Sequence, residues 1–200
     1  MRVIITLAAL AAVFFVDGAL AQTTGGKASR TSDGLQFAIN RVNIDQQGSL
    51  TIQYAVENTT KSRQYLMLFG ATSAALDSGE TGNADNSKIS GLSHCFFYSS
   101  GDADSLIGCK NANNGSNSNR GGTNLENYTY IEPGELAQAS ISYMMGFGHG
   151  QSAKTASFTF KALLVTAPVD SPEIEDPSKA IQHARIVNIN FPFVPIDGRN

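Results

Sequence analysis

Residues 35–57 read LQFAINRVNIDQQGSLTIQYAVE, and this stretch decides the fold. Apolar residues alternate with polar or small ones from Leu35 to Ile39 and again from Leu50 to Val56, which is the pattern of half-buried strands. The alternation changes phase before Val42, and this predicts a bulge or a bend. Residues 45–48 supply a short turn that ends in glycine, so the sequence predicts an antiparallel hairpin.

Further short strands, separated by turn residues, are expected along the rest of the chain. Residues 65–70 form a continuous apolar run, which is typical of a strand covered on both faces. The other strands are expected at residues 94–98, 106–109, 128–131, 137–143, 157–165 and 186–191. Many short strands with regular turns predict an all-β fold, an immunoglobulin-like antiparallel β-sandwich.

The C-terminal part carries two further expectations. Residues 168–185 hold the only helical signal, because Pro172 and Pro177 each follow a residue that can cap a helix, and one short helical turn is predicted there. The closing strand is expected to end at Pro192 and Pro195, since proline cannot donate to a strand ladder.

The N-terminus has the three parts of a secretory signal peptide. Arg2 is followed by an apolar run up to Val16, and small residues at Ala19 and Ala21 suit a signal peptidase. We expect residues 1–21 to be cleaved off, which makes the protein periplasmic or secreted with no stable membrane insertion afterwards. The alternative is an uncleaved anchor, but Asp17 and Gly18 interrupt the apolar run before it reaches spanning length.

Residues 22–33 are small and polar, so they are expected to form a flexible leader. Order is expected from Gly34, and residues 34–200 have a length that suits one domain.

The charge of the chain argues against a nucleic-acid partner. Its formal net charge is -3, and removing residues 1–21 takes away Arg2 and Asp17, one charge of each sign. The basic residues are scattered singly or in pairs, whereas binding to a polyphosphate needs them clustered. The expected partner is an unknown protein or glycan outside the cytoplasm.

Cys95 and Cys109 are the two cysteines of the chain, and both lie in the exported part. An oxidising compartment makes a disulfide between them the expected state. A metal site is the alternative, with His94 adjacent, but it would need further soft ligands.

No catalytic, metal-binding or cofactor-binding motif emerges from the sequence. The Gly-rich run at residues 146–150 lies between two strand patterns, whereas a phosphate-binding glycine loop leads a strand into a helix. His94, His149 and His183 are not at metal-ligand spacing, and a Gly-x-Ser-x-Gly nucleophile elbow does not occur. We therefore expect no enzyme, no metal and no cofactor.

Two acidic pairs could offer oxygens to a calcium ion, namely Asp102 with Asp104 and Asp77 with Glu80. Neither run completes a calcium loop, so the formation of turns is the favoured purpose.

The exposed polar segments suggest recognition. Asn58, Asn114 and Asn127 begin Asn-x-Ser/Thr patterns, which are glycosylation acceptors in an exported chain. Exposed tyrosines near an Asn-rich loop bring contact area at low entropic cost, although such tyrosines also fill half-buried strands. The residues of this possible recognition loop are Asn114, Asn127, Tyr128, Tyr130, Phe147 and His149.

The order of certain segments is similar to that of a known group of proteins. The segments are a strand ending in Val56-Glu57-Asn58-Thr59, an Asp77-x-Gly79 turn and a later Pro133-Gly134-Glu135 before an apolar strand. Over residues 34–191 the chain resembles secreted bacterial immunoglobulin-like domains of unassigned function, and more weakly immunoglobulin-like proteinase inhibitors. The resemblance implies the sandwich fold and no catalytic residues.

These observations predict an exported, non-enzymatic binding or structural module of the cell envelope or the extracellular space. The alternative is a proteinase inhibitor that inserts loops such as residues 144–154 into a protease. A hydrolase is the least favoured class, because it needs a histidine in contact with a serine or a carboxylate.

Overall fold

The computed structural model describes residues 26–69, 72–85, 88–98, 106–110, 117–118, 127–145, 152–167 and 184–199. Every regular element in these residues is a strand. The strands are β1 (Ala28–Ser32), β2 (Leu35–Ile44), β3 (Ser49–Asn58), β4 (Arg63–Phe69), β5 (Ser73–Leu76), β6 (Thr81–Asn83), β7 (His94–Tyr98), β8 (Leu106–Lys110), β9 (Asn117–Ser118), β10 (Thr129–Ile131), β11 (Leu136–Met144), β12 (Thr155–Ala167) and β13 (Arg185–Pro195). The predicted helical turn falls almost wholly outside the described residues.

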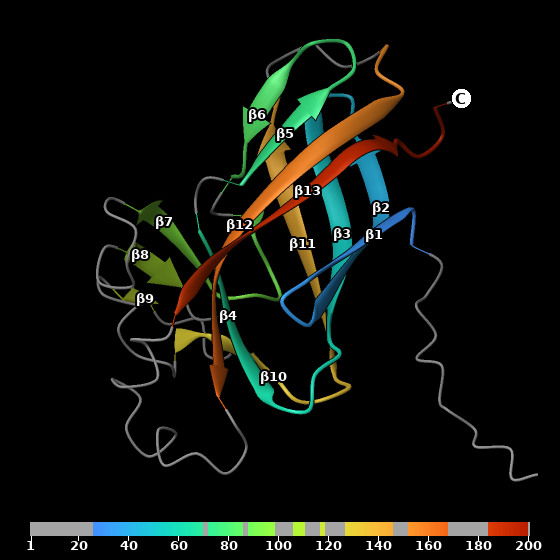
Figure 1. Ribbon diagram of the computed structural model, residues 1–200. Coiled ribbons are helices and arrows are strands. Elements are labelled where there is room, and N and C mark those ends of the chain that lie inside the picture. The colour runs from blue at the N-terminus through green and yellow to red at the C-terminus, as the bar shows by residue number, and fades with distance from the viewer. Residues whose placement is uncertain are drawn as a thin grey trace, which may run out of the picture.

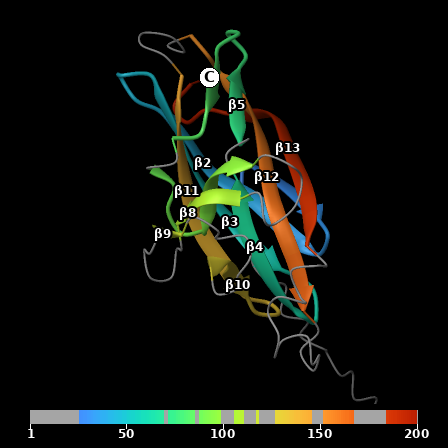
Figure 2. The ribbon, with the colours of Figure 1, turned by 90° about the vertical axis from the view of Figure 1, so that its left-hand side faces the viewer.

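The strands form two sheets that face each other (Figures 1 and 2). The first sheet has the order β1-β2-β3-β11, and the second has the order β6-β5-β12-β4-β7-β8-β9 with β10 beside β4 and β13 beside β12. All pairings are antiparallel except the short one between β4 and β7. The predicted all-β antiparallel sandwich is therefore confirmed, while its immunoglobulin-like character stays a prediction.

The hairpin predicted from residues 35–57 is present as β2 and β3. Ile39 pairs with Tyr54 and Arg41 pairs with Gln53, so Asn40 is an extra residue on β2. This bulge is the phase change seen in the sequence, and it re-aims the side chain of the extra residue.

The turn of this hairpin is held by its own side chain and by a glycine. One carboxylate oxygen of Asp45 accepts hydrogen bonds from the backbone N–H groups of Gln47 and Ser49 at 2.9 and 2.8 Å. Gly48 has a φ of 81°, a conformation that favours glycine. Local chemistry therefore fixes the register of the two strands.

Aromatic rings from both sheets meet in the core. The ring of Phe160 on β12 is fully buried and lies 5.1 Å from that of Tyr54, 6.5 Å from that of Phe37 and 5.7 Å from that of Phe191, measured between centroids. Such offset and edge-on pairs add to the free energy of burial. Phe160 is thus the residue on which the packing of the two layers centres.

Strand β4 is covered on both faces, as the continuous apolar run predicted. Leu66 and Leu68 belong to the core between the sheets, whereas the intervening Met67 has no exposed surface and Tyr65 is 8% exposed. This strand therefore needs apolar residues at consecutive positions rather than at alternate ones.

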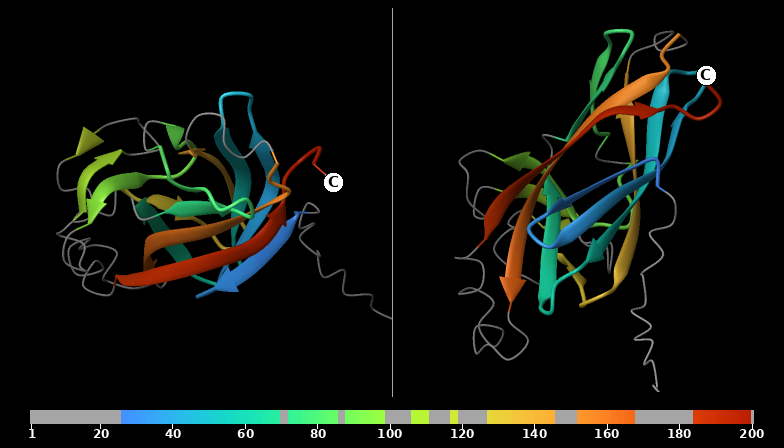
Figure 3. Two further views of the ribbon diagram at one scale, coloured as in Figure 1. Left: turned by 90° about the horizontal axis from the view of Figure 1, so that it is seen from above. Right: turned by 45° about the vertical axis from the view of Figure 1, so that its right-hand side comes forward.

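The flexible leader predicted for residues 22–33 is wrong for residues 28–32, because these form β1 and pair antiparallel with β2. The strand buries little and is held by ladder hydrogen bonds instead of a hydrophobic face. The side chain of Lys27, just before it, lies 2.7 Å from a carboxylate oxygen of Asp197, and β1 runs beside β13 (Figure 3). The two ends of the domain are thus joined at one edge of the sandwich.

Asp197 fastens this edge through both its backbone and its side chain. Its N–H donates to the carbonyl of Val42, and its carboxylate accepts from the N–H of Val42 at 2.9 Å. Partial desolvation acts to raise the pKa of Asp197, but the hydrogen bonds from Lys27 and Val42 outweigh it and the pKa lies below the usual value. The carboxylate stays ionised at neutral pH.

The last strand, β13, passes Pro192 and ends at Pro195, the second of the two prolines at which its end was predicted. Among the described strands, β13 pairs only with β12. An edge strand tolerates proline because its outer N–H groups are not needed for a ladder. The register shifts between Ala156 and Phe158 on β12, opposite residues 191–194, so β13 carries a bulge there. Phe193 in this bulge has a φ of 52°.

The opposite edge of the sandwich is closed by the segment after β6. Isolated bridges join Ala84 to Tyr143 and Ser90 to Ser140, so this segment covers the outer edge of β11. Gly91 allows this segment to lie close to the backbone of β11. Its φ is 83°, and a Cβ atom there would lie 2.1 Å from the carbonyl oxygen of Gln138. Within the described part of the chain, no helix is long and apolar enough to span a membrane.

Candidate functional site

The structure separates the two tyrosines of the predicted recognition loop. Tyr128 has no exposed surface, and burial raises its pKa, whereas Tyr130 is 50% exposed. The guanidinium of Arg63 lies over the Tyr130 ring, 5.2 Å from its centroid, and is also hydrogen-bonded to Glu132. Asn127 is half-buried next to Tyr128. Of the two tyrosines, Tyr130 therefore offers an aromatic surface and Tyr128 does not. Asn114, Phe147 and His149 lie outside the described residues.

The two cysteine segments lie side by side, as β7 and β8 of one antiparallel pair. Cys95 and Cys109 are direct register partners, which places their Cα atoms about 4.5–5.5 Å apart. A disulfide spans Cα distances of about 4.4–6.8 Å. The side chain of Cys109 lies outside the described residues, so the bond itself stays a prediction that this register permits.

We expect the purified, exported protein to contain no reactive thiol, and reduction to lower its free energy of unfolding by about 3 kcal/mol, the value for a loop of roughly fifteen residues. A thiol assay in denaturant and urea unfolding with and without a reductant measure both. The variant with both Cys95 and Cys109 changed to serine is the control, because a reductant should not affect it. Two titratable thiols in the untreated protein would contradict the disulfide.

Asn58, the first of the glycosylation acceptor patterns, is an interior residue. It has no exposed surface, and its amide nitrogen donates to the carbonyls of Ser62 and Ile131 at 2.8 Å each. Its amide oxygen accepts from the N–H and the hydroxyl of Thr60 at 3.0 and 2.7 Å. In the folded protein this side chain is therefore structural and has no room for a glycan.

Asp77, one of the calcium alternatives, is used as a turn residue. Its carboxylate accepts hydrogen bonds from the N–H groups of Lys154 and Thr155 and from the Thr155 hydroxyl, at 3.0 to 3.3 Å. Slight desolvation acts to raise the pKa of Asp77, but these bonds outweigh it and lower the pKa. The side chain thus anchors the β5–β6 turn to the start of β12, as the sequence favoured. Asp102 and Asp104 lie outside the described residues.

His94 is buried, and its Nδ1 lies 3.2 Å from the carbonyl oxygen of Leu92, while His149 and His183 lie outside the described residues. Over the described ranges, histidine, cysteine and acidic side chains form no group of three that could hold a metal ion.

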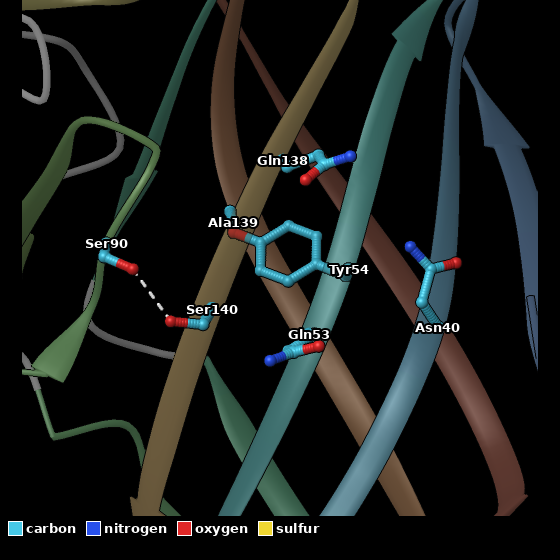
Figure 4. Close-up of a pocket in the computed structure, with 7 residues that line it drawn as sticks. All are labelled: Asn40, Gln53, Tyr54, Ser90, Gln138, Ala139 and Ser140. Carbon is cyan, nitrogen blue, oxygen red and sulfur yellow. Dashed lines mark hydrogen bonds between the residues drawn. The ribbon is translucent and has the colours of Figure 1, made fainter. Parts of the chain in front are cut away.

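An open groove of about 500 Å³ runs across the outer face of the first sheet. The residues that line it are Asn40, Gln53, Tyr54, Ser90, Gln138, Ala139 and Ser140 (Figure 4). They come from β2, β3, β11 and the segment that covers the edge of β11, so the groove crosses the strands instead of following one. With strands spaced about 4.8 Å apart, it extends over roughly 14 Å from Asn40 to Ser90.

The alternation of the strands explains which side chains reach the groove. Gln53 and Ser140 are register partners with outward side chains, and Gln138 follows two residues before Ser140 on the same face. Asn40 is the bulged residue of β2. Figure 4 shows the amide groups of Asn40, Gln53 and Gln138 placed around Tyr54. Tyr54 and its partner Ala139 line the groove from beneath, because their side chains belong to the core on the inner face of the sheet.

Hydroxyl groups form the wall at the β11 edge. The side-chain oxygens of Ser90 and Ser140 lie 2.8 Å apart, and the backbones of these two residues exchange two hydrogen bonds. Farther along β3 and β11, the hydroxyls of Thr51 and Ser142 lie 2.9 Å apart. The wall is therefore well supported and carries no charge.

The groove is electrically neutral. None of its lining residues is acidic or basic, and burial, followed by the proximity of Tyr143, raises the pKa of Tyr54 well above its usual value. The Tyr54 hydroxyl and the Asn40 amide oxygen are buried beneath the groove and have no hydrogen-bond partner among the described residues. A rotation about χ2 exchanges the oxygen and nitrogen of an Asn amide, so Asn40 can present either a donor or an acceptor.

Comparison with known proteins identifies no family. No family model matches the chain, and no curated protein matches it. Among solved structures, one match is a family 123 glycoside hydrolase from Clostridium perfringens, described in a study of glycolipid glycan hydrolysis, with a TM-score of 0.30 and 10% sequence identity. The match covers 82% of this chain and only 28% of that chain, and a likeness this weak supports no argument about fold or activity.

The chemistry that this groove can perform is recognition by hydrogen bonding. Amides and hydroxyls both donate and accept, so the lining suits a ligand that is itself rich in such groups. Sites for small apolar ligands are enclosed and mostly hydrophobic, and this groove is neither. Sequence reasoning missed it because Gln53 and Gln138 look like ordinary solvent-facing strand residues. The phase change that produces the Asn40 bulge was the one available signal.

Proposed function

We propose that this protein is an exported, non-enzymatic binding module that holds an uncharged glycan chain in the groove across β2, β3 and β11. Export rests on the secretory signal expected in residues 1–21, and the periplasm or the extracellular space is the proposed location. The observation that carries the ligand class is the lining of the groove, in which amide and hydroxyl side chains are combined with no charge.

The position of the groove favours a glycan over a peptide. A peptide usually binds a sheet by adding a strand to a free edge. In the first sheet the edge of β11 is covered by the segment that contains Ser90, and the other edge is β1, which runs beside β13. A ligand on the face of the sheet meets side chains instead of ladder groups, and a polyhydroxylated chain can use them all.

The absence of charged residues in the groove also argues against charged ligands. Phosphate groups and nucleic acids are held by clustered lysines and arginines, and none lines the groove. Acidic sugars such as uronic acids would lack a counter-charge for the same reason. Neutral sugars need no basic side chain as a partner, so we expect a polysaccharide of neutral residues.

The proteinase inhibitor stays the alternative. Met144, at the start of the proposed inhibitory loop of residues 144–154, is 70% exposed. Most of the rest of that loop lies outside the described residues. An inhibitor must bind its protease through this loop, whereas the glycan proposal places binding on another part of the molecule.

The test is binding of the mature chain to neutral polysaccharides, measured by calorimetry after a glycan-array screen. The double variant Gln53→Ala/Gln138→Ala should bind at least about tenfold more weakly, because each lost hydrogen bond is worth about 1 kcal/mol. Gln47→Ala removes an exposed glutamine from the hairpin turn and should bind like the parent protein.

Two outcomes would overturn the proposal. One is the absence of binding to every neutral glycan tested, and the other is binding that the double variant retains at full strength. Saturable inhibition of a secreted protease, lost when Met144 is replaced, would instead establish the alternative.

A further inference from the structure

Phe193 is held in an unfavourable position by the fold. Its side chain is 72% exposed, and its φ of 52° places a bulky residue in the left-handed region. Residues other than glycine and asparagine rarely adopt this conformation, at a cost of about 1–3 kcal/mol. An exposed phenyl ring also gives up the free energy that its burial would provide. Such a combination points to a role for the ring outside the fold itself.

The bulge of β13 fixes the ring on the outer side of the second sheet. The N–H of Phe193 donates to the hydroxyl of Ser157 on β12 at 3.1 Å, in place of a ladder bond. Its neighbours Phe191 and Val194 are buried in the core, which anchors the bulge on both sides. The backbone beneath the ring is therefore defined, and the ring does not belong to a loose loop.

Ser157 connects Phe193 to a second groove, of about 210 Å³, between β5, β6 and β12. The residues that line it are Ser73, Ala74, Ala75, Thr81, Gly82, Asn83, Ser157 and Thr159. All are small and uncharged, and five of them carry a hydroxyl or an amide. Next to the groove, the Thr159 hydroxyl donates to the amide oxygen of Asn190 on β13 at 2.9 Å.

We propose that Phe193 and this second groove form a second glycan-binding site, and this inference rests on the proposed function for its ligand class. A sugar ring has an apolar C–H face and a rim of hydroxyl groups. The exposed phenyl ring provides a flat surface for the C–H face, and the serine, threonine and asparagine side chains provide partners for the rim. A charged ligand would find no counter-charge among the lining residues.

The two sites lie on opposite faces of the sandwich. The first groove is on the outer face of the sheet that contains β3, and Phe193 is on the sheet that contains β12, with the aromatic core between them. One protein molecule can therefore hold two glycan chains at once, and binding gains avidity where those two chains belong to one connected polysaccharide.

The experiment is calorimetry with a neutral oligosaccharide identified in the screen above. The parent protein should bind two ligands per chain, and Phe193→Ala should bind one. Phe193→Tyr should restore the second site because it keeps an aromatic face, whereas Phe193→Leu should not, because an aliphatic side chain offers no flat surface. Unchanged urea unfolding of all three variants confirms that the fold is intact.

The outcomes separate this inference from the proposed function. If Gln53→Ala/Gln138→Ala removes one site and Phe193→Ala the other, both hold. A stoichiometry of one that Phe193→Ala leaves unchanged would overturn the second site alone, as would equal binding by Phe193→Leu. If Phe193→Ala instead converts a dimer into a monomer in sedimentation, the ring contacts a second copy and the inference is wrong.

Discussion

Replacing Phe160 with alanine is expected to lower the free energy of unfolding by about 3–5 kcal/mol. The residue is fully buried, and its ring lies within 6.5 Å of three aromatic rings drawn from both sheets. Those rings come from strands that cannot close around the missing side chain, so a cavity remains between the layers. Urea unfolding followed by circular dichroism measures the loss.

The matched control is Phe193→Ala, which removes the same side chain from an exposed position and should change stability by about 0.5 kcal/mol or less. Phe160→Leu provides a milder change if the alanine variant does not fold, and it should still be less stable than the parent. A loss below about 1 kcal/mol for Phe160→Ala would contradict a core shared by the two sheets.

The second large effect is expected at Asn58. Replacement by alanine removes four hydrogen bonds. The buried carbonyl of Ile131 loses the Asn58 donor, and the carbonyl of Ser62 keeps only the hydroxyl of Thr60. Each unsatisfied buried group costs about 1–3 kcal/mol, so a total loss of about 3 kcal/mol or more is expected. Thermal and urea unfolding of the variant give this value.

Two further variants show whether the effect comes from hydrogen bonding. Asn43→Ala changes an exposed asparagine on β2 and should leave stability nearly unchanged. Asn58→Asp keeps the shape but places a carboxylate oxygen against two carbonyls, so it should destabilise at neutral pH. If Asn58→Asp were as stable as the parent, the donor role of the amide would be refuted.

The sequence predicted those parts of the fold that depend on local pattern. The alternation of apolar and polar residues predicted the β2–β3 hairpin, and the break in its phase predicted the bulge that lies at Asn40. The glycine at position 48 indicated the turn between the two strands. Strand β1 was missed because an edge strand held by ladder bonds and by the Lys27–Asp197 ion pair needs no apolar residues. Composition alone cannot distinguish such a strand from a leader.

The groove could not be predicted because it depends on pairing between distant parts of the chain. Gln53 and Ser140 become partners through the register of β3 with β11, and Ser90 arrives through an isolated bridge. No local pattern encodes either contact. The two cysteine segments were expected to lie side by side if their cysteines pair, and β7 and β8 are neighbours in register.

The burial of Asn58 also limits how this protein can be produced. A eukaryotic secretory pathway attaches oligosaccharides to Asn-x-Thr while the chain is still unfolded, before the amide of Asn58 can reach the carbonyls of Ser62 and Ile131. A chain modified there could no longer seat that side chain and would stay trapped outside the native state. Yeast or mammalian secretion should therefore yield misfolded material, whereas a bacterial host that lacks this transferase should not.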